Sequence, residues 1–173
     1  IARGYRPSGV NFRPDNAETL TFESERSWNF ELGFKSSWLD DRLGINFAAF
    51  YNPVKDYQVQ EFDSTSFVPV GIANADARIS GFELELRATP IPGLDITAGF
   101  GLADAEFTDF PDRPDRDGNA LPFAPELTYN VGVQYRSPNG IFGRLELTGV
   151  GTTFFDEDNT LKQDPYAIVN ARL

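Results

Sequence analysis

The 173-residue chain contains no cysteine, no histidine and no methionine. Without cysteine it has neither a disulfide framework nor a thiolate metal site. Without histidine, the serine–histidine and cysteine–histidine nucleophilic sites and the histidine–zinc sites are excluded within this segment. The formal net charge of -11 argues against nucleic acid as a partner, because nucleic-acid binding requires a basic patch. We therefore expect no enzymatic activity, no bound cofactor and no nucleic-acid partner.

The chain also lacks a long apolar run. No stretch approaches the ~18–20 residues of a membrane helix, and no signal peptide is visible. The mean hydropathy of -0.35 is nevertheless compatible with a membrane barrel, whose strands alternate apolar and polar residues. Because Ile1 is not a natural initiator and residues 167–173 have the pattern of a strand, we expect a piece of a longer protein.

Roughly seven stretches alternate apolar with polar residues. In the clearest one, Trp28, Phe30, Leu32 and Phe34 share one face, and Asn29, Glu31, Gly33 and Lys35 share the other. This two-residue period predicts strands with one apolar and one wet face. We expect a bulge or a strand end at Pro53 and a bulge around Gly149–Gly151. The expected strands are residues 1–6, 26–38, 43–52 with a continuation at 56–60, 82–88, 94–102, 127–136, 144–148 and 167–173.

The links between these strands are alternately short and long. Short links at 39–41, 89–93 and 137–140 alternate with long polar links near 61–76, 108–126 and 156–164. Tight turns on one side and long loops on the other are typical of an antiparallel up-and-down transmembrane β-barrel. Propeller blades lack this regular difference. A soluble β-sandwich also alternates, so the period alone leaves that alternative open.

The placement of aromatic residues favours lipid over a soluble core. Trp28 and Trp38 share a face of one strand ten residues apart, which corresponds to a height of about 25 Å in a tilted strand, the height of an outer-membrane apolar band. Tyr51, Tyr57, Tyr129 and Tyr135 also lie toward strand ends, where an amphipathic ring suits a lipid–water boundary. We predict that the aromatic girdles contain Trp28, Trp38, Tyr51, Tyr129 and Tyr135.

The opposite faces carry charges of both signs and many small residues. This pattern predicts a wide, water-filled interior, although each charge by itself can simply be solvated. Glu83 and Glu85 have the spacing of paired carboxylates, but no enclosing cleft is implied. The predicted lumen-facing residues are Glu31, Lys35, Glu83, Glu85, Arg87, Arg144 and Glu146.

An ordered set of stretches resembles the C-terminal half of a TonB-dependent outer-membrane receptor of the siderophore type. The stretches are residues 3–11, 25–36, 56–59, 81–86, 121–126 and 166–173. The resemblance implies an outer-membrane protein of a Gram-negative bacterium with a 22-stranded barrel and an N-terminal plug domain. Residues 1–173 would supply about eight of the strands, and the plug and the remaining strands would be absent.

The same resemblance implies active uptake of an iron–siderophore complex, or less often of cobalamin, haem or another large nutrient. The implied partners are outer-membrane lipid, the plug domain, the TonB energy-coupling complex and the nutrient. A passive porin-like barrel or an adhesin remains an alternative from a different class. The predicted lumen-facing charges are candidates for contact with the plug.

The long loops would face the outside of the cell and help to capture the ligand. Cations and aromatic rings suit an anionic ferric chelate, although any one of them can also be a loop residue that packs on its neighbours. Residues 115–119 hint at a calcium loop, but Pro122 and Pro125 favour an ordinary acidic loop. The candidate ligand residues are Arg6, Asn11, Phe12, Arg13, Phe67, Phe154 and Phe155.

Overall fold

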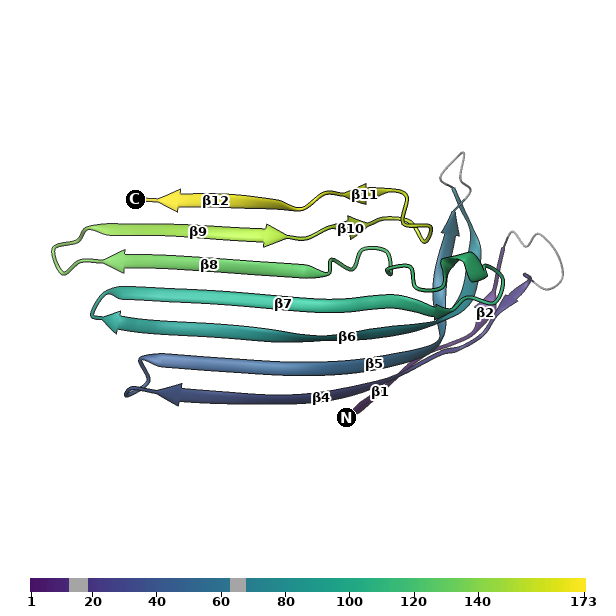
Figure 1. Ribbon diagram of the computed structural model, residues 1–173, viewed down its shortest axis with the longest axis horizontal. Helices are drawn as coiled ribbons and strands as arrows, with labels where there is room; N and C mark the ends of the chain where they lie inside the picture. Colours follow the sequence, from purple (N-terminus) through teal and green to yellow (C-terminus); the bar gives the residue numbers. More distant parts are fainter. Residues whose placement is uncertain (13–18, 63–67) are drawn as a thin grey trace.

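The computed structural model describes residues 1–12, 19–62 and 68–173, and its main element is one eight-stranded antiparallel sheet (Figure 1). Its order is β1-β4-β5-β6-β7-β8-β9-β12, so the sheet is an open arc with β1 and β12 at its edges. This confirms the predicted barrel-wall fold. The strands are β1 (Ala2–Arg6), β4 (Glu25–Trp38), β5 (Leu43–Phe62), β6 (Pro69–Ile91), β7 (Leu94–Asp109), β8 (Leu127–Arg136), β9 (Phe142–Val150) and β12 (Tyr166–Arg172).

Short turns lie at one end of the sheet and longer connections at the other (Figure 1). At the turn end, Leu39, Asp40 and Asp41 adopt positive φ, and Gly93 has a φ of 84° in the turn from β6 to β7. At the loop end lie two short hairpins and a 3-10 turn. These elements are β2 (Gly9–Val10) with β3 (Thr21–Phe22), β10 (Thr153–Phe154) with β11 (Lys162–Gln163), and η1 (Pro114–Arg116).

Two strands are much longer than the alternation predicted. β6 begins at Pro69, so most of the expected link at 61–76 is strand, and β7 continues to Asp109, past its expected end at residue 102. The pattern was missed there because the apolar face becomes charged in this part of the wall, with Arg78 opposite Glu106, while the opposite face carries the buried Phe107. The expected links also contain the two short hairpins.

Neither predicted irregularity occurs where it was expected. Pro53 stays in register with Arg78, and the register of β5 with β6 shifts between Val54 and Tyr57, where Asp56 has a φ of 56°, and again between Glu61 and Phe62. No bulge occurs in β9, because Gly149 pairs with Tyr129 and β9 ends one residue later. A glycine is required there, since the Tyr129 ring fills the space that a Cβ would occupy.

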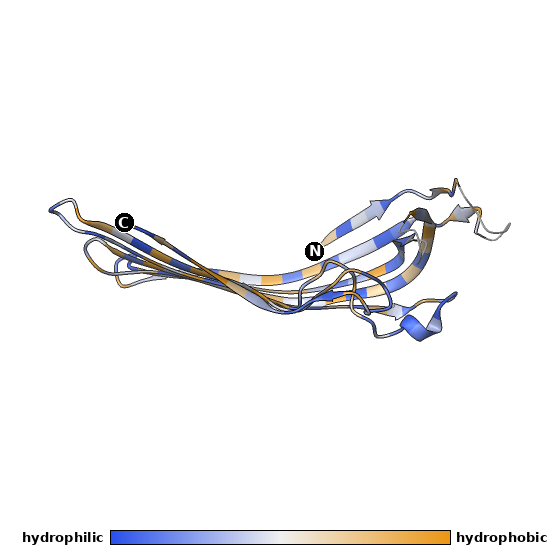
Figure 2. Cartoon of the chain, turned by 90° about the horizontal axis from the view of Figure 1, so that it is seen from above, coloured by the Kyte–Doolittle hydropathy of each residue, from blue (hydrophilic) through white to orange (hydrophobic). Residues whose placement is uncertain are grey.

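The two faces of the sheet separate apolar from charged residues, as Figure 2 indicates by the alternating colours along each strand. On the apolar face, aromatic rings stack across four strands. The ring centroids lie 5.6 Å apart for Phe34 and Phe47, 6.1 Å for Phe47 and Phe82, and 5.8 Å for Phe82 and Phe100. No second sheet covers this face in the described part of the chain, and Leu32 is 78% exposed. The β-sandwich alternative is therefore wrong.

The buried core lies at the loop end, on the charged face of the sheet. The segment after β7 folds back along that strand. The Gly118 amide donates to the Phe107 carbonyl at 2.8 Å and the Leu121 amide to the Ala105 carbonyl at 2.8 Å. This return buries Phe107 and Phe110 completely. The core residues are Val54, Val59, Ala75, Ala77, Ala105, Phe107, Phe110 and Leu121.

Across the described ranges, no helix has the length and apolar character needed to span a membrane.

Candidate functional site

The predicted lumen-facing residues all lie on the charged face. Glu83 is opposite Ala48, Glu85 is opposite Asn46, and Glu146 is opposite Gly132. The Asn46 amide donates to Glu85 at 3.0 Å, and Arg144 bonds to Glu146 on its own strand. A shallow groove of about 420 Å³ crosses this face, lined by Gly44, Asn46, Glu85, Leu86, Arg87, Thr97, Ala98, Gly99 and Asn130. Contact of this face with a plug domain stays a prediction.

The predicted girdle residues all lie on the apolar face. Trp38 and Tyr135 lie near the turn end, opposite Leu43 and Leu94. Trp28 and Tyr51 lie near the loop end, and Tyr129 lies two residues inside the first residue of β8. Above this zone the same face becomes charged, since Arg78 pairs with Glu106 at 2.6 Å. The placement fits two boundary zones, and their contact with lipid remains a prediction.

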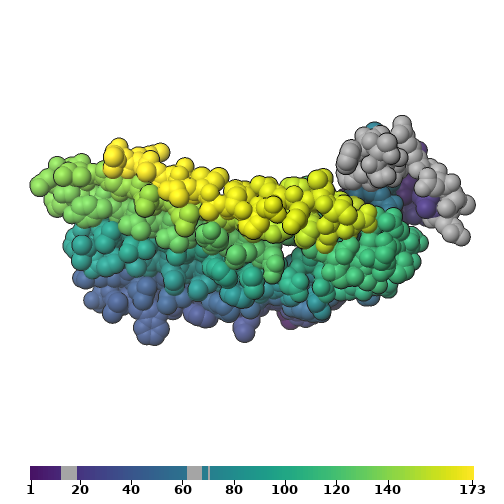
Figure 3. All heavy atoms as spheres, turned by 45° about the horizontal axis from the view of Figure 1, so that its top comes forward, coloured from purple at the N-terminus to yellow at the C-terminus, as the bar shows by residue number. Residues whose placement is uncertain are grey.

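A pocket of about 240 Å³ lies among the connections at the loop end. It is formed by residues far apart in the sequence: Arg6 ends β1, Tyr57 follows the bulge of β5, and the loops after β7 and β10 add two phenylalanines. Figure 3 shows the two loop segments, green and yellow-green, packed together at this end. The lining residues are Arg6, Tyr57, Gln58, Val59, Gln60, Ile72, Pro122, Phe123, Phe155 and Glu157.

The two phenylalanines form a tilted aromatic pair in this pocket. The centroids of Phe123 and Phe155 lie 5.5 Å apart, and the Phe123 amide donates to the Phe154 carbonyl at 2.8 Å. Phe123 has a φ of 62°, which costs a non-glycine residue conformational energy, and its side chain stays 70% exposed. A strained, exposed ring held beside a second ring and a cation suits the binding of a flat or aromatic anion.

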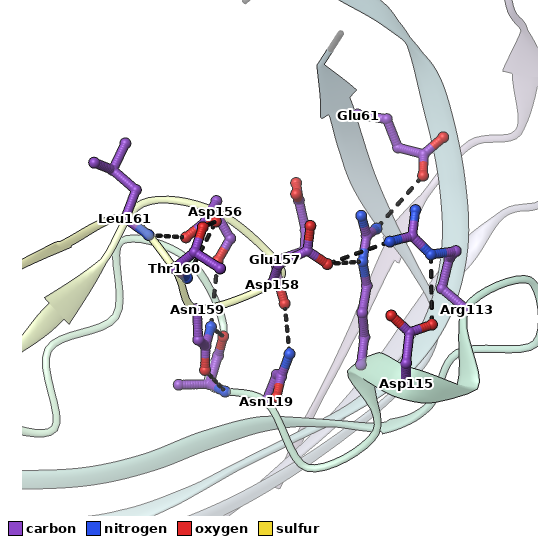
Figure 4. Close-up of polar contacts among 12 residues, drawn as sticks. Glu61, Arg113, Asp115, Asn119, Asp156, Glu157, Asp158, Asn159, Thr160 and Leu161 are labelled. Carbon is purple, nitrogen blue, oxygen red and sulfur yellow. Dashed lines mark hydrogen bonds and ion pairs between the residues drawn. The ribbon is translucent and has the colours of Figure 1, made fainter. Parts of the chain in front are cut away.

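A buried arginine ties the two loops to each other and to the wall (Figure 4). The Arg116 side chain is only 7% exposed; its Nε donates to Asp158 Oδ1 at 2.8 Å, and its Nη1 lies 3.5 Å from Glu61. Its guanidinium also lies 5.2 Å from the centroid of the Phe110 ring. Arg113 reaches the same Asp158 oxygen at 3.4 Å. Arg116 therefore connects η1, the β10–β11 hairpin and β5.

Two asparagines complete this connection. The Ala120 amide donates to the Asn159 side chain at 2.8 Å, and Asn159 donates back to the Ala120 carbonyl at 2.9 Å. The Asn119 side chain donates to the Glu157 carbonyl at 2.9 Å. These hydrogen bonds join the loop after β7 to the β10–β11 hairpin, with Asn159 bonding both backbone groups of Ala120. The two loops that carry Phe123 and Phe155 are therefore held together.

Two adjacent carboxyl groups of the hairpin have opposite pKa shifts. Partial burial raises the pKa of Glu157, with Glu61 and Asp158 acting in the same direction and Arg116 opposing them. Burial also acts to raise the pKa of Asp156, but hydrogen bonds from Thr160 and the Leu161 amide outweigh it and the pKa is lowered. The hairpin thus contains one carboxyl whose pKa is raised and one whose pKa is lowered.

We expect Glu157→Gln to stabilise the hairpin at pH 7. Because the folded pKa of Glu157 is raised, its stabilising contribution is present below the ordinary glutamate value of 4.5 and is lost as the pH rises through the folded pKa. Hydrogen exchange of the peptide containing Ala120 should slow in the variant at pH 7 and match the wild type near pH 4. Asp156→Asn should instead destabilise the hairpin at pH 7. Because the folded pKa of Asp156 is lowered, its stabilising contribution is fully present above the ordinary aspartate value of 3.8 and is lost as the pH falls through the folded pKa. Equal exchange in all three proteins at pH 7 would contradict this assignment.

The structure brings together only some of the predicted ligand residues. Arg6 and Phe155 line the pocket, whereas Phe154 lies in β10 and Phe12 is 77% exposed, both outside the lining. Asn11 is 7% exposed and its amide donates to the carbonyls of Thr19 and Ile72, so it fastens the β2–β3 hairpin to β6. Arg13 and Phe67 lie outside the described residues.

Sequence reasoning missed Phe123, Arg116 and Glu157. Its placement of Tyr57 at a lipid–water boundary was wrong, because the bulge in β5 turns this residue to the charged face, where it lines the pocket. The other three lie in loops without a period, and only the hydrogen bonds between the two loops bring them together. The run Leu121–Glu126 carried a family resemblance but no chemical signal for a site.

Comparison with known proteins gives concordant results. The family model described as "TonB dependent receptor-like, beta-barrel" matches residues 1–173. The chain is 33% identical over 186 residues to the pesticin receptor of Yersinia enterocolitica, covering 100% of this chain and 25% of that protein. It is 27% identical to the probable TonB-dependent siderophore receptor PiuA of Acinetobacter baumannii, covering 74% of this chain and 18% of that protein.

Among solved structures, the chain is similar to the ferric yersiniabactin uptake receptor FyuA from Yersinia pestis. The TM-score is 0.76 at 30% sequence identity, over 98% of this chain and 26% of that one. The 173 residues thus span about a quarter of the length of the pesticin receptor and of FyuA.

Proposed function

Because the chain belongs to the TonB-dependent receptor β-barrel family, we propose that it forms part of the wall of a receptor that actively imports a ferric siderophore. Proteins of this family reside in the outer membrane of Gram-negative bacteria. In the proposed mechanism the long loops capture the chelate, and a plug domain against the charged face then rearranges. The energy comes from the inner membrane through TonB. The role is transport, with no catalytic step.

The observation that supports this proposal is the pocket at the loop end. Arg6 supplies a cation to an anionic chelate, and Phe123 and Phe155 supply aromatic faces for a flat ligand. Relatives named as receptors for pesticin and for ferric yersiniabactin match the chain over nearly its whole length.

The test measures binding and uptake of radioactive iron, supplied as ferric yersiniabactin, by cells that carry the full receptor as their sole siderophore receptor. In the binding measurement we expect Arg6→Gln and Phe155→Ala each to raise the dissociation constant about tenfold, since each removes an interaction of about 1–2 kcal/mol. Arg42→Gln, which removes the same charge at the turn end, is the matched control.

Two outcomes would contradict the proposal. Binding that is unchanged in both pocket variants would exclude the pocket as the capture site for this chelate. Uptake that persists at full rate in cells without TonB would instead support the passive porin-like alternative.

A further inference from the structure

The loop end of the sheet consists of two bodies, each with its own internal hydrogen bonds. The Asn11 side chain donates to the Ile72 carbonyl at 2.9 Å and accepts from the Ile72 amide at 2.8 Å. The Gln58 side chain donates to the carbonyls of Pro7 at 2.8 Å and Glu23 at 3.0 Å. These contacts join the β2–β3 hairpin to the tip of the β5–β6 hairpin. The first body comprises residues 7–12, 19–24, 57–62 and 69–75.

The second body is formed by the segment that follows β7 and by the β10–β11 hairpin. The hydrogen bonds of Arg116, Asn119 and Asn159 join these two parts. The ladder between β6 and β7 ends where Asp76 lies opposite Asp109, so strand pairing does not continue from one body to the other. The second body comprises residues 110–126 and 153–163.

The pocket at the loop end lies between the two bodies. Its lining includes Tyr57 and Gln60 of the first body, and Phe123 and Phe155 of the second. The bodies also share the buried apolar core, to which Val59 of the first and Leu121 of the second belong. Apolar packing has no preferred direction, so it defines the separation of the bodies less sharply than a hydrogen bond does. The separation of the bodies in turn determines the width of the pocket.

One ion pair joins the two bodies directly. Nη1 of Arg116 in the second body lies 3.5 Å from Oε1 of Glu61 in the first (Figure 4), and no hydrogen bond between described residues links the bodies. This Nη1 atom is buried and has no hydrogen-bond partner among the described residues. Charge-assisted hydrogen bonds of this kind measure about 2.7–2.9 Å, so an approach of about 0.7 Å would complete the bond. Because an unsatisfied buried donor is unfavourable, the arrangement favours that approach.

We propose that Glu61 is a positioning residue for capture of the chelate, because it pairs with Arg116 between the two bodies and sets the width of the pocket. The inference rests on the proposed function, in which an anionic chelate occupies this pocket. A chelate that contacts both Tyr57 and Phe155 bridges the bodies and draws them together. Nη1 of Arg116 then reaches Glu61, and the completed hydrogen bond slows release of the chelate.

The first test measures the separation of the bodies in the full receptor before any chelate is added. The 173 residues contain no cysteine, so Val10→Cys and Leu161→Cys, at positions that are 68% and 52% exposed, can place one spin label in each body. We expect a narrow distribution of distances between the labels, which Glu61→Ala broadens. Glu23→Ala is the matched control. It removes the same charge from the first body, but the hydrogen bonds of Glu23 use its backbone, so the distribution should stay narrow.

The second test measures the binding rates of ferric yersiniabactin. Glu61→Ala should speed release of the chelate about tenfold, which corresponds to the loss of one charge-assisted hydrogen bond, and leave the association rate unchanged. Glu61→Gln keeps the length of the side chain and one acceptor oxygen, so its release rate should lie between those of the wild type and Glu61→Ala. A folding defect would lower the amount of chelate bound without producing this graded order.

The two tests separate this inference from the proposed function. A wild-type receptor that does not bind the chelate would refute the proposed function, whereas the distances in the free receptor test the role of Glu61 by themselves. The role of Glu61 is overturned if Glu61→Ala leaves the distance distribution as narrow as in the wild type. It is equally overturned if Glu61→Ala and Glu23→Ala release the chelate at the same rate.

Discussion

Replacing Ala49 with arginine is expected to lower the free energy of unfolding of the full receptor in lipid vesicles by about 2 kcal/mol, within the range for a cation inside an apolar barrel face. Ala49 lies on the apolar face of β5, opposite Leu32 and Phe82. Among the described strand residues, no charged side chain lies opposite or diagonal to Ala49 on that face, so the guanidinium must be buried in lipid or distort the wall. Fewer heat-resistant receptors should also accumulate in the outer membrane.

Ala48→Arg provides the matched control, because it makes the same substitution one residue away. Ala48 lies on the charged face, opposite Gly33 and Glu83, so the new guanidinium can pair with a carboxylate. We expect a change of about 1 kcal/mol or less. If the two variants lost equal stability, the apolar face would not be the lipid-facing side of the wall.

Replacing Arg116 with glutamine is expected to separate the two loops that pack together at the loop end of the sheet. The substitution removes the only described cation that reaches both Asp158 and Glu61, and breaking a buried charge-assisted contact costs about 1–3 kcal/mol. We expect limited proteolysis of the β10–β11 hairpin to become about tenfold faster. Affinity for a bound ferric chelate should also fall, because Phe123 and Phe155 lose their shared support.

Arg113→Gln separates the role of this buried arginine from a general effect of charge. Arg113 belongs to the same segment and reaches the same carboxylate, but its side chain is 43% exposed and its contact is longer. Exposed ion pairs contribute about 0–1 kcal/mol, so this variant should resemble the wild type. Equal sensitivity to protease in the two variants would show that Arg116 has no special role in joining the loops.

The alternation along each strand was enough to predict the wall. For Trp28–Phe34 the period determines which side chains share a face, because successive residues of any extended strand point in opposite directions. The registers confirm those faces on every long strand, including all seven charges predicted to be opposite the apolar band. In these strands the two-residue period of the backbone is therefore enough to assign each side chain to a face of the sheet.

The loop end could not be predicted in the same way. The bulge at Lys55 and Asp56 determines which face Tyr57 occupies, and the folding of the 110–126 segment onto β7 buries Phe107 and Phe110. These features depend on contacts between residues that are far apart in the chain. The alternation of apolar and polar residues carries no information about such contacts. The pocket and the contacts of Arg116 could therefore not be predicted from the sequence.

The sequence by itself therefore determined the strands of the apolar zone, the two faces of the sheet there and the family that the wall resembles. Only the tertiary structure decided that Arg6, Tyr57, Phe123 and Phe155 share a pocket, and that Arg26 lies directly opposite Lys55. The physical reason is the range of the interactions. Strand periodicity is fixed by backbone geometry within a few residues, whereas cross-strand register and loop contacts are fixed by the sum of packing and hydrogen bonds over the whole sheet.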